Sequence, residues 1–157
     1  MDTMPVRIAE LKDVDAITRL INRAFDAEQP FIIGERIDLA GVRELLSKGK
    51  FLVAEEQGAL VACLYVDARG QRAHLGLVSV DPQRQGRGLG SHLMAAAEAH
   101  CRAAGFREME LRFIHERAEL QRFYEGLGYS PTGIKEFPDP SRMRVPFHFA
   151  QMTKRLE

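Results

Sequence analysis

Three glycines at alternating positions are the feature of this 157-residue sequence that points most clearly to chemistry. Gly86, Gly88 and Gly90 follow an apolar stretch typical of a strand and precede a helical pattern. Glycines let consecutive backbone N–H groups turn toward one point, and the start of a helix adds a partial positive charge. Arg84 and Arg87 add further positive charge. The segment therefore predicts a site for phosphate oxygens, although the same glycines could simply form a tight turn.

Two common phosphate-binding motifs do not fit this segment. A P-loop requires a lysine directly after its last glycine, and no lysine lies between Lys50 and Lys135. The Rossmann fingerprint requires its third glycine where Ser91 stands, and it opens a βαβ unit instead of following antiparallel strands. The sequence thus argues against a nucleotide-binding module of either kind.

Two motifs together resemble the GNAT (Gcn5-related) N-acetyltransferase superfamily. Residues 85–90, Gln-Gly-Arg-Gly-Leu-Gly, fit that family's Gln/Arg-x-x-Gly-x-Gly/Ala pyrophosphate loop, and residues 78–82 look like the strand end before it. Residues 123–129, Phe-Tyr-Glu-Gly-Leu-Gly-Tyr, resemble a helix end that follows the loop in the same family. The close resemblance covers about residues 77–130.

The resemblance implies a mixed α/β (α+β) fold, the GNAT fold, with a central, mostly antiparallel twisted sheet of roughly six or seven strands and about four flanking helices. It also implies acetyl-CoA as co-substrate, no metal, and direct transfer of the acetyl group to an amine in a ternary complex. The residues that would bind acetyl-CoA are Val78, Ser79, Val80, Gln85, Gly86, Arg87, Gly88, Leu89, Gly90, Ser91 and Arg117.

Tyr124 matches the family's general acid, which would protonate the departing thiolate of CoA. A tyrosine phenol has an ordinary pKa of about 10, so it is protonated at neutral pH and can donate. Tyr124 could instead only pack in an apolar stripe of its helix. The backbone of residues 77–80 would bind the pantetheine arm, and an N–H group near Val78 would stabilise the oxyanion.

Tyr129 stands where the family usually has phenylalanine, and two further features depart from the family pattern. Arg117 stands where members often place an asparagine that touches pantetheine; it could donate to a pantetheine carbonyl or to a phosphate, or it could be a solvated side chain. The strand 74–80 has no glutamate where many members have one, so the general base stays open. Glu110, His115, His148 and a chain of waters are the candidates.

The resemblance places the acceptor between residues 26–34 and the loop after Gly133. Asp26, Glu28 and Glu35 could attract a cationic amine there. The acceptor, a small molecule or a peptide amine, cannot be identified from the sequence. Two alternatives are a non-catalytic domain of the same fold that binds or senses acyl-CoA, and a transferase for a longer acyl-CoA.

The elements that position these motifs follow from the hydrophobic pattern. Helical spacing predicts helices over 14–25, 38–46, 88–104 and 120–127. Alternation and turn residues predict strands over 6–9, 51–55, 60–66, 74–80, 108–114 and 147–152. Short turns make the three strands before the glycine loop an antiparallel meander. The segment 130–146, which holds four of the seven prolines, shows no clear pattern.

Composition is that of one globular domain spanning residues 1–157, with 45% hydrophobic and 28% charged residues. Basic and acidic residues both number 22, so no positive excess suggests a nucleic-acid partner. The longest apolar run, 59–66, is far shorter than the ~20 residues that span a bilayer, and the N-terminus lacks an export signal. We therefore expect a cytoplasmic protein without nucleic-acid or membrane partners, which could form a homodimer.

Overall fold

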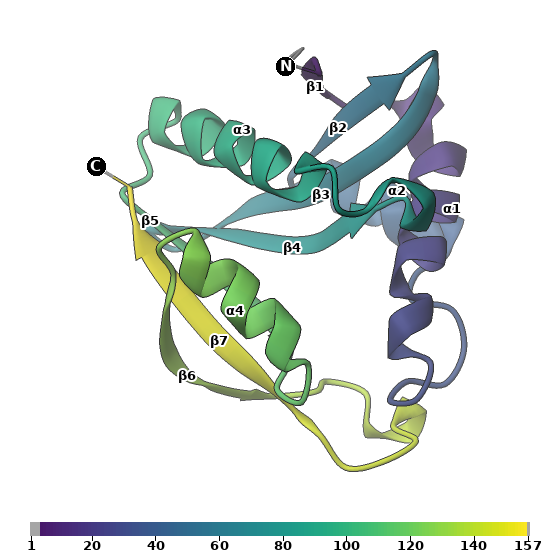
Figure 1. Ribbon diagram of the computed structural model, residues 1–157, viewed down its shortest axis with the longest axis vertical. Helices are drawn as coiled ribbons and strands as arrows, with labels where there is room; N and C mark the ends of the chain where they lie inside the picture. The colour runs from purple at the N-terminus through teal and green to yellow at the C-terminus, as the bar shows by residue number, and fades with distance from the viewer. Residues whose placement is uncertain (1–3, 157) are drawn as a thin grey trace.

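The computed structural model describes residues 4–156, and its central feature is a seven-stranded sheet (Figure 1). The strands are β1 (Val6–Ile8), β2 (Lys50–Glu56), β3 (Ala59–Arg69), β4 (Arg72–Val80), β5 (Glu108–Ile114), β6 (Ser130–Glu136) and β7 (His148–Arg155). Their order across the sheet is β1-β2-β3-β4-β5-β7-β6. Every neighbouring pair is antiparallel except β4 and β5, which are parallel. This confirms the expected mixed α/β fold with a mostly antiparallel sheet.

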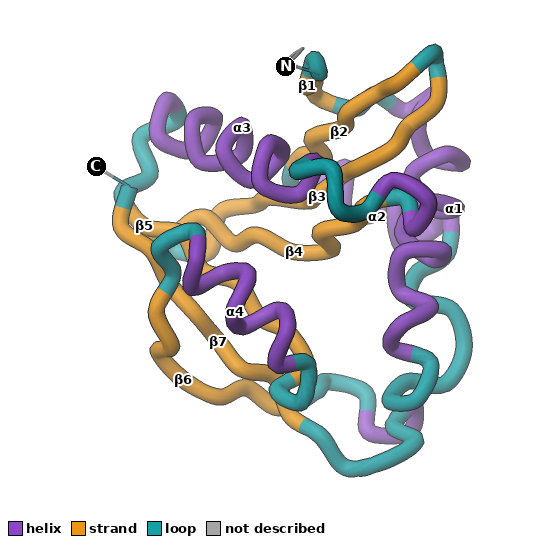
Figure 2. The backbone as a smooth tube through the Cα atoms, viewed as in Figure 1, coloured by secondary structure: helices purple, strands orange, loops and turns teal. Residues whose placement is uncertain are grey.

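Helices cover both faces of the sheet (Figure 2). The α-helices are α1 (Val14–Ala24), α2 (Leu39–Lys48), α3 (Leu89–Ala103) and α4 (Ala118–Gly126), and the 3-10 helices are η1 (Leu11–Asp13), η2 (Phe25–Glu28), η3 (Pro82–Arg84) and η4 (Pro140–Arg142). Within residues 4–156, none of them is both long and apolar enough to cross a membrane. The four α-helices agree with the sequence prediction.

The central strands β2 and β3 are buried on both sides. Successive side chains of a strand point to opposite faces. Phe51 and Val53 accordingly pack with α1 and α2, whereas Leu52 and Ala54 belong to the core beneath α3 and α4. Burial on both faces explains why these strands read as continuous apolar runs instead of alternating ones.

The parallel pair β4 and β5 is short. Residues 73–75 pair with residues 109–111, and the two strands then separate. Beyond that point β4 stays paired with β3 up to Val80, whereas β5 follows β7 up to Ile114. The facing edges of β4 and β5 are therefore left without a strand partner along the rest of their length.

The structure contains a strand, β6, that the sequence pattern did not predict. It pairs with β7 at the edge of the sheet, with a register shift between Pro131 and Gly133. All of its residues are exposed. Because neither face is buried and the strand contains proline and glycine, it shows no alternation of apolar and polar residues. The prediction also ended β7 too early, at Met152 instead of Arg155.

Two loops close on each other at the end of the molecule where η2 and η4 lie (Figure 1). Ile32, which follows η2, forms an isolated antiparallel bridge with Met143, which follows η4. The Arg142 guanidinium donates to the carbonyl of Ile33 at 3.0 Å. Phe147 packs with Ile32 in a small apolar cluster beneath this contact. The contact fixes the segment after η2, which was predicted to border the acceptor.

Two neighbouring glycines at the end of α4 should respond in opposite ways to substitution by alanine. Gly128 has a φ of 99°, and a Cβ there would lie 3.3 Å from the Lys154 side chain. Gly126 is helical, and the space beside its Cα is open. We expect Gly128→Ala to lower the free energy of unfolding by about 1–2 kcal/mol. Gly126→Ala should raise it by up to ~1 kcal/mol.

Urea unfolding followed by circular dichroism measures both effects. Destabilisation of similar size in the two variants would contradict the assignment of the helix end, because it would show that Gly128 has no special conformational role.

Candidate active site

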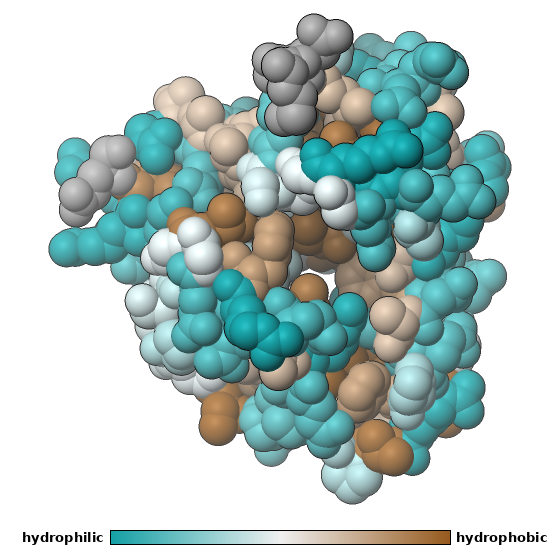
Figure 3. Space-filling model, in the orientation of Figure 1, coloured by the Kyte–Doolittle hydropathy of each residue, from teal (hydrophilic) through white to brown (hydrophobic). Residues whose placement is uncertain are grey.

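A cleft of about 840 Å³ opens where β4 and β5 separate. Figure 3 shows a hollow at this place, with hydrophobic residues at its floor and hydrophilic ones along its rim. Most of the predicted site residues line the cleft: Val78, Val80, Gln85, Gly86, Gly88, Leu89, Gly90, Ser91, Arg117 and Tyr124. Ser79 and Arg87 are not among the lining residues. The fold thus brings the two sequence motifs to one cavity.

The glycine loop leads into a helix start that no side chain caps. Gly88 is the N-cap residue of α3 with a φ of 79°, and Gly86 has a φ of 84°, a left-handed region that favours glycine. The space beside both Cα atoms is open. The first N–H groups of an α-helix have no partner within the helix, and within residues 4–156 no side chain caps them here. The loop therefore offers free donors and the positive end of the helix dipole to an anion.

The structure changes the sequence interpretation of this loop at two positions, Gly90 and Arg84. A Cβ on Gly90 would lie 3.3 Å from the ring of Phe123, so the third glycine lets α3 pack closely on α4. The Arg84 guanidinium donates to Glu56 at 2.9 Å and to Asp81 at 3.1 Å. These two carboxylates compensate its charge, so the expectation that Arg84 adds positive charge to the site is wrong. Arg87 forms no ion pair with the residues from 4 to 156 and keeps its charge available.

A β-bulge lies where β4 leaves β5. Gly76 pairs with Tyr65 and Ser79 with Cys63, so β4 has one residue more than β3 between these pairs. Leu77 within the bulge has a φ of 54°, which is strained for a leucine. The Ser79 hydroxyl donates to the Leu77 carbonyl at 2.9 Å and stabilises this conformation. The N–H group predicted to stabilise an oxyanion, near Val78, belongs to this bulge.

Tyr124 forms part of the cleft wall on the α4 side. Its side chain is only 6% exposed, and its ring centroid lies 5.8 Å from that of Phe113 and 5.1 Å from that of Phe123. Burial raises the pKa of the Tyr124 phenol; Arg117 opposes this increase and Glu28 adds to it. The phenol therefore keeps its proton at neutral pH. Tyr124 both packs in the core and lines the cleft, so packing and proton donation are compatible.

Arg117 is held in an ion pair and is not a solvated side chain. Its guanidinium donates to the buried carboxylate of Glu28 at 2.9 Å and lies 3.3 Å from Glu119. Burial raises the pKa of Glu28, and the bond from Arg117 opposes this increase. The pair connects the start of α4 with η2 across the cleft. Arg117 still lines the cleft, where it stays a predicted contact for acetyl-CoA.

The three side chains that the sequence offered as general bases do not line the cleft. Glu110 is buried on β5, 3.8 Å from the imidazole of His74 and 3.7 Å from the Arg112 guanidinium. The rings of His115 and His148 stack with their centroids 3.7 Å apart, and His115 Nδ1 lies 3.0 Å from the His148 carbonyl oxygen. Across residues 4–156, no three histidine, cysteine or acidic side chains gather in a way that could hold a metal ion.

His74 is a candidate base that sequence reasoning missed. It lines the cleft on β4, and its Nδ1 atom is buried without a hydrogen-bond partner in residues 4–156. Its Nε2 atom lies 3.7 Å from the position that a Cβ on Gly76 would take. Burial lowers the pKa of the imidazole, Arg69 acts in the same direction and Glu110 opposes both. The ring is therefore neutral at neutral pH and able to accept a proton.

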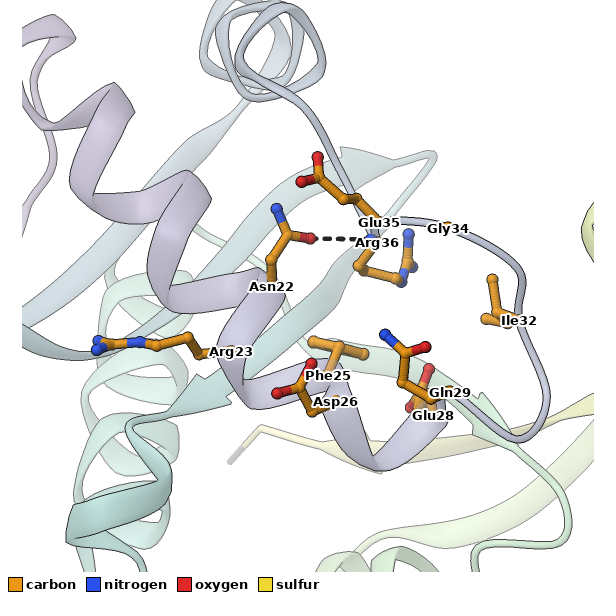
Figure 4. A pocket seen from close by; sticks show the side chains of 10 residues that line it. All are labelled: Asn22, Arg23, Phe25, Asp26, Glu28, Gln29, Ile32, Gly34, Glu35 and Arg36. Atoms are coloured by element: carbon orange, nitrogen blue, oxygen red, sulfur yellow. Dashed lines mark hydrogen bonds between the residues drawn. The ribbon is translucent and has the colours of Figure 1, made fainter.

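A smaller pocket of about 450 Å³ adjoins the cleft (Figure 4). It is lined by the end of α1, by η2 and by the loop that leads to α2. Phe25, Glu28 and Arg36 line both cavities. Asp26 and Glu35, which were predicted to attract an amine, also line the smaller pocket. The predicted acceptor segment 26–34 therefore borders a cavity that shares three lining residues with the cleft.

Comparisons with known proteins agree with this arrangement. The family model described as "Acetyltransferase (GNAT) family" matches residues 14–129. The chain is 28% identical over 137 residues to an amino-acid acetyltransferase of Azotobacter vinelandii, which covers 85% of this chain and 29% of that protein. It is 28% identical over 123 residues to a mycothiol acetyltransferase of Actinosynnema mirum, which covers 76% of this chain and 41% of that protein. The chain thus spans less than half the length of these curated relatives.

A solved structure shares the fold. The phosphinothricin acetyltransferase of Sinorhizobium meliloti, in complex with acetyl-CoA, superposes with a TM-score of 0.79 at 20% sequence identity. The superposition covers 99% of this chain and 89% of that one. At this level of identity the likeness concerns the fold alone.

Proposed function

The chain belongs to the GNAT acetyltransferase family, and from this premise we propose that it transfers the acetyl group of acetyl-CoA directly to an amine within a ternary complex. The observation that carries the proposal is the cleft between β4 and β5. It combines uncapped helix-start N–H groups, a free strand edge, a protonated tyrosine and a neutral histidine in one cavity.

The chain's own groups fit such a donor along the whole cleft. We propose that the backbone N–H groups of residues 86–91 bind the pyrophosphate, since they are donors at the positive end of α3. The edge of β4 from Gly76 to Val80, which has no strand partner on the β5 side, would bind the pantetheine amides through its N–H and C=O groups. Arg87 would contribute positive charge near the phosphates, and Arg117, whose charge Glu28 and Glu119 compensate, would contribute N–H donors to the pantetheine arm.

The proposed reaction forms one bond and breaks one. The nitrogen of the neutral amine attacks the carbonyl carbon, a C–N bond forms, and the C–S bond breaks with its electron pair going to sulfur. An N–H group of the bulge near Val78 stabilises the charge on the carbonyl oxygen. Tyr124 gives its proton to the sulfur, and His74 takes the proton that the nitrogen loses. The products are an N-substituted acetamide and the CoA thiol, and exchange with solvent returns a proton to Tyr124 and removes one from His74 before the next turnover.

His74 suits the role of base better than the three residues that the sequence suggested. Of His74, Glu110, His115 and His148, it is His74 that lines the cleft. The lowered pKa of its imidazole keeps the ring neutral. Glu110 lies 3.8 Å away and opposes the effect of burial on the imidazole. A negative charge at that distance would stabilise the imidazolium that forms when the proton arrives.

The alternatives differ in what they predict for turnover. A domain that only binds or senses acyl-CoA would show no release of free thiol with any amine, and it would not need a proton donor and a neutral base in its cleft. A transferase for a longer acyl-CoA would favour a longer thioester over acetyl-CoA. Thiol release measured with a panel of primary amines and with thioesters of increasing length separates the three possibilities.

Tyr124→Phe should lower kcat by about 10²-fold, the lower end of the ~10²–10⁴-fold range of general acids, because thiolate is already a fairly good leaving group. The affinity for CoA should stay unchanged, since only one oxygen is removed. Steady-state thiol release with the most active amine of the panel and calorimetric titration with CoA measure the two quantities.

Tyr129→Phe is the matched control: its hydroxyl bonds Glu98 in the core, away from the cleft. A Tyr124→Phe enzyme with the kcat of the unaltered protein would leave Tyr124 as a packing residue.

His74→Gln should lower kcat/KM by about 10²-fold at neutral pH and remove a limb of the pH profile. Only the neutral imidazole accepts a proton, and burial holds the pKa of His74 below the ordinary value of about 6.5. With the amine at saturation, so that protonation of the free amine does not enter, the kcat of the unaltered enzyme should therefore hold as the pH falls to that value and decrease at lower pH. His148→Gln should retain this acid limb. The same limb in His74→Gln would exclude His74 as the base.

A further inference from the structure

Arg36 lies at the junction of the cleft and the smaller pocket and lines both. Its backbone is fixed on α1, because Asn22 Oδ1 accepts from the Arg36 N–H group at 2.9 Å and Asn22 Nδ2 donates to the Ile37 carbonyl at 2.8 Å. Figure 4 shows the Arg36 side chain inside the ring of residues that line the pocket. A rigid loop thus holds a guanidinium in the pocket.

The Arg36 guanidinium has donors without acceptors. A guanidinium carries five N–H donors, yet the Arg36 side chain forms neither a hydrogen bond nor an ion pair within residues 4–156. Its described contact is with the ring of Phe25, whose centroid lies 5.3 Å from Arg36 Cζ. Glu28 is the carboxylate that acts on it electrostatically, and Glu28 already accepts from Arg117. One positive charge in the pocket is left unmatched by a bonded partner.

The surroundings remove part of the hydration of this charge, because Arg36 is half-buried. Burial lowers the pKa of Arg36, and Arg142 acts in the same direction, while Glu28 opposes both. The side chain of Glu35 points away from that of Arg36 in Figure 4. The donors of Arg36 are open to the pocket, so an anion that enters the pocket can accept hydrogen bonds from them.

The chemistry of the pocket favours a carboxylate over a phosphate. The planar fork of a guanidinium matches the two oxygens of a carboxylate. Asp26, Glu28 and Glu35 all line the pocket and would repel a doubly charged phosphate more strongly than a singly charged carboxylate. The residues of the glycine loop line the cleft and not this pocket, so an anion inside the pocket is not the pyrophosphate of CoA.

We propose that Arg36 binds the carboxylate of the acceptor, so that the acceptors are small amines that also carry a carboxylate, as amino acids do. This inference rests on the proposed transfer to an amine and names its substrate class. A molecule with its carboxylate at Arg36 extends from the smaller pocket into the cleft, because Arg36 lines both cavities. Its amine would then enter the cleft, whose lining also includes His74.

The test compares each proteinogenic amino acid with the amine that remains when its carboxylate is removed, for example phenylalanine with phenethylamine and lysine with cadaverine. Thiol release from acetyl-CoA is measured for the unaltered enzyme, Arg36→Gln and Arg19→Gln. Arg19 is the matched control, because it is an exposed arginine on α1 that lines neither cavity.

The best acceptor should be an amino acid whose kcat/KM exceeds that of its decarboxylated partner by about 100-fold, since a site built to bond a polar group rejects analogues without it. Arg36→Gln should lower kcat/KM for the acid by about 10- to 100-fold, mainly through KM, as expected for a lost charged hydrogen bond. Arg36→Gln should leave kcat/KM for the amine within a few fold of the value for the unaltered enzyme. Arg19→Gln should change kcat/KM neither for the acid nor for the amine. The unfolding temperature of Arg36→Gln should change little, because the side chain loses only its contact with the Phe25 ring and the attraction of Glu28, and no hydrogen bond or ion pair.

Equal rates for acid and amine in the unaltered enzyme, or equal losses for both in Arg36→Gln, would overturn the role of Arg36 while leaving amine acetylation intact. Calorimetric binding of CoA without thiol release for any acid or amine would be a different result. It would overturn the proposed transferase function itself, and the substrate class with it.

Discussion

The separation of β4 from β5 is the constraint on which the rest of the site depends. β4 pairs with β3 along most of its length but with β5 through only three residues of each strand. The divergence leaves backbone donors and acceptors along the edge of β4 without a strand partner, and such groups are costly to bury unless something bonds them. An extended molecule with amide groups can take the place of the missing strand. The strained bulge at Leu77 lies within this open edge.

The other elements bring their functional groups to this opening from opposite faces of the sheet. β4 continues through η3 and the glycine loop into α3, so the helix start lies at one end of the open edge. β5 leads into α4, which carries Tyr124 to the other wall. On the opposite face η2 contributes Glu28, and the contact between Ile32 and Met143 fixes the loop that follows it. One face can therefore bind an anionic donor while the other admits the acceptor.

The local motifs were predictable from the sequence, whereas contacts between distant segments were not. The glycine loop and Tyr124 lie in short patterns, and their helices follow from regular apolar spacing. Arg84 was misinterpreted because its partner Glu56 lies on another strand. His74 and Arg36 were missed because a single titratable residue shows no pattern; the roles proposed for them depend on the cavity that folding builds around them. The cytoplasmic location, the homodimer and the single domain over 1–157 stay predictions.

Amide hydrogen exchange with and without acetyl-CoA, resolved by residue, tests the central claim most directly. The account predicts that acetyl-CoA slows exchange in two segments, 76–80 and 86–91, whose N–H groups include donors without internal partners. Gly88→Glu, which would place a carboxylate in the proposed phosphate site, should show no such protection, whereas Gly58→Glu in the β2–β3 turn should behave like the unaltered protein. Binding of acetyl-CoA with protection elsewhere, and unchanged exchange in both segments, would contradict the account.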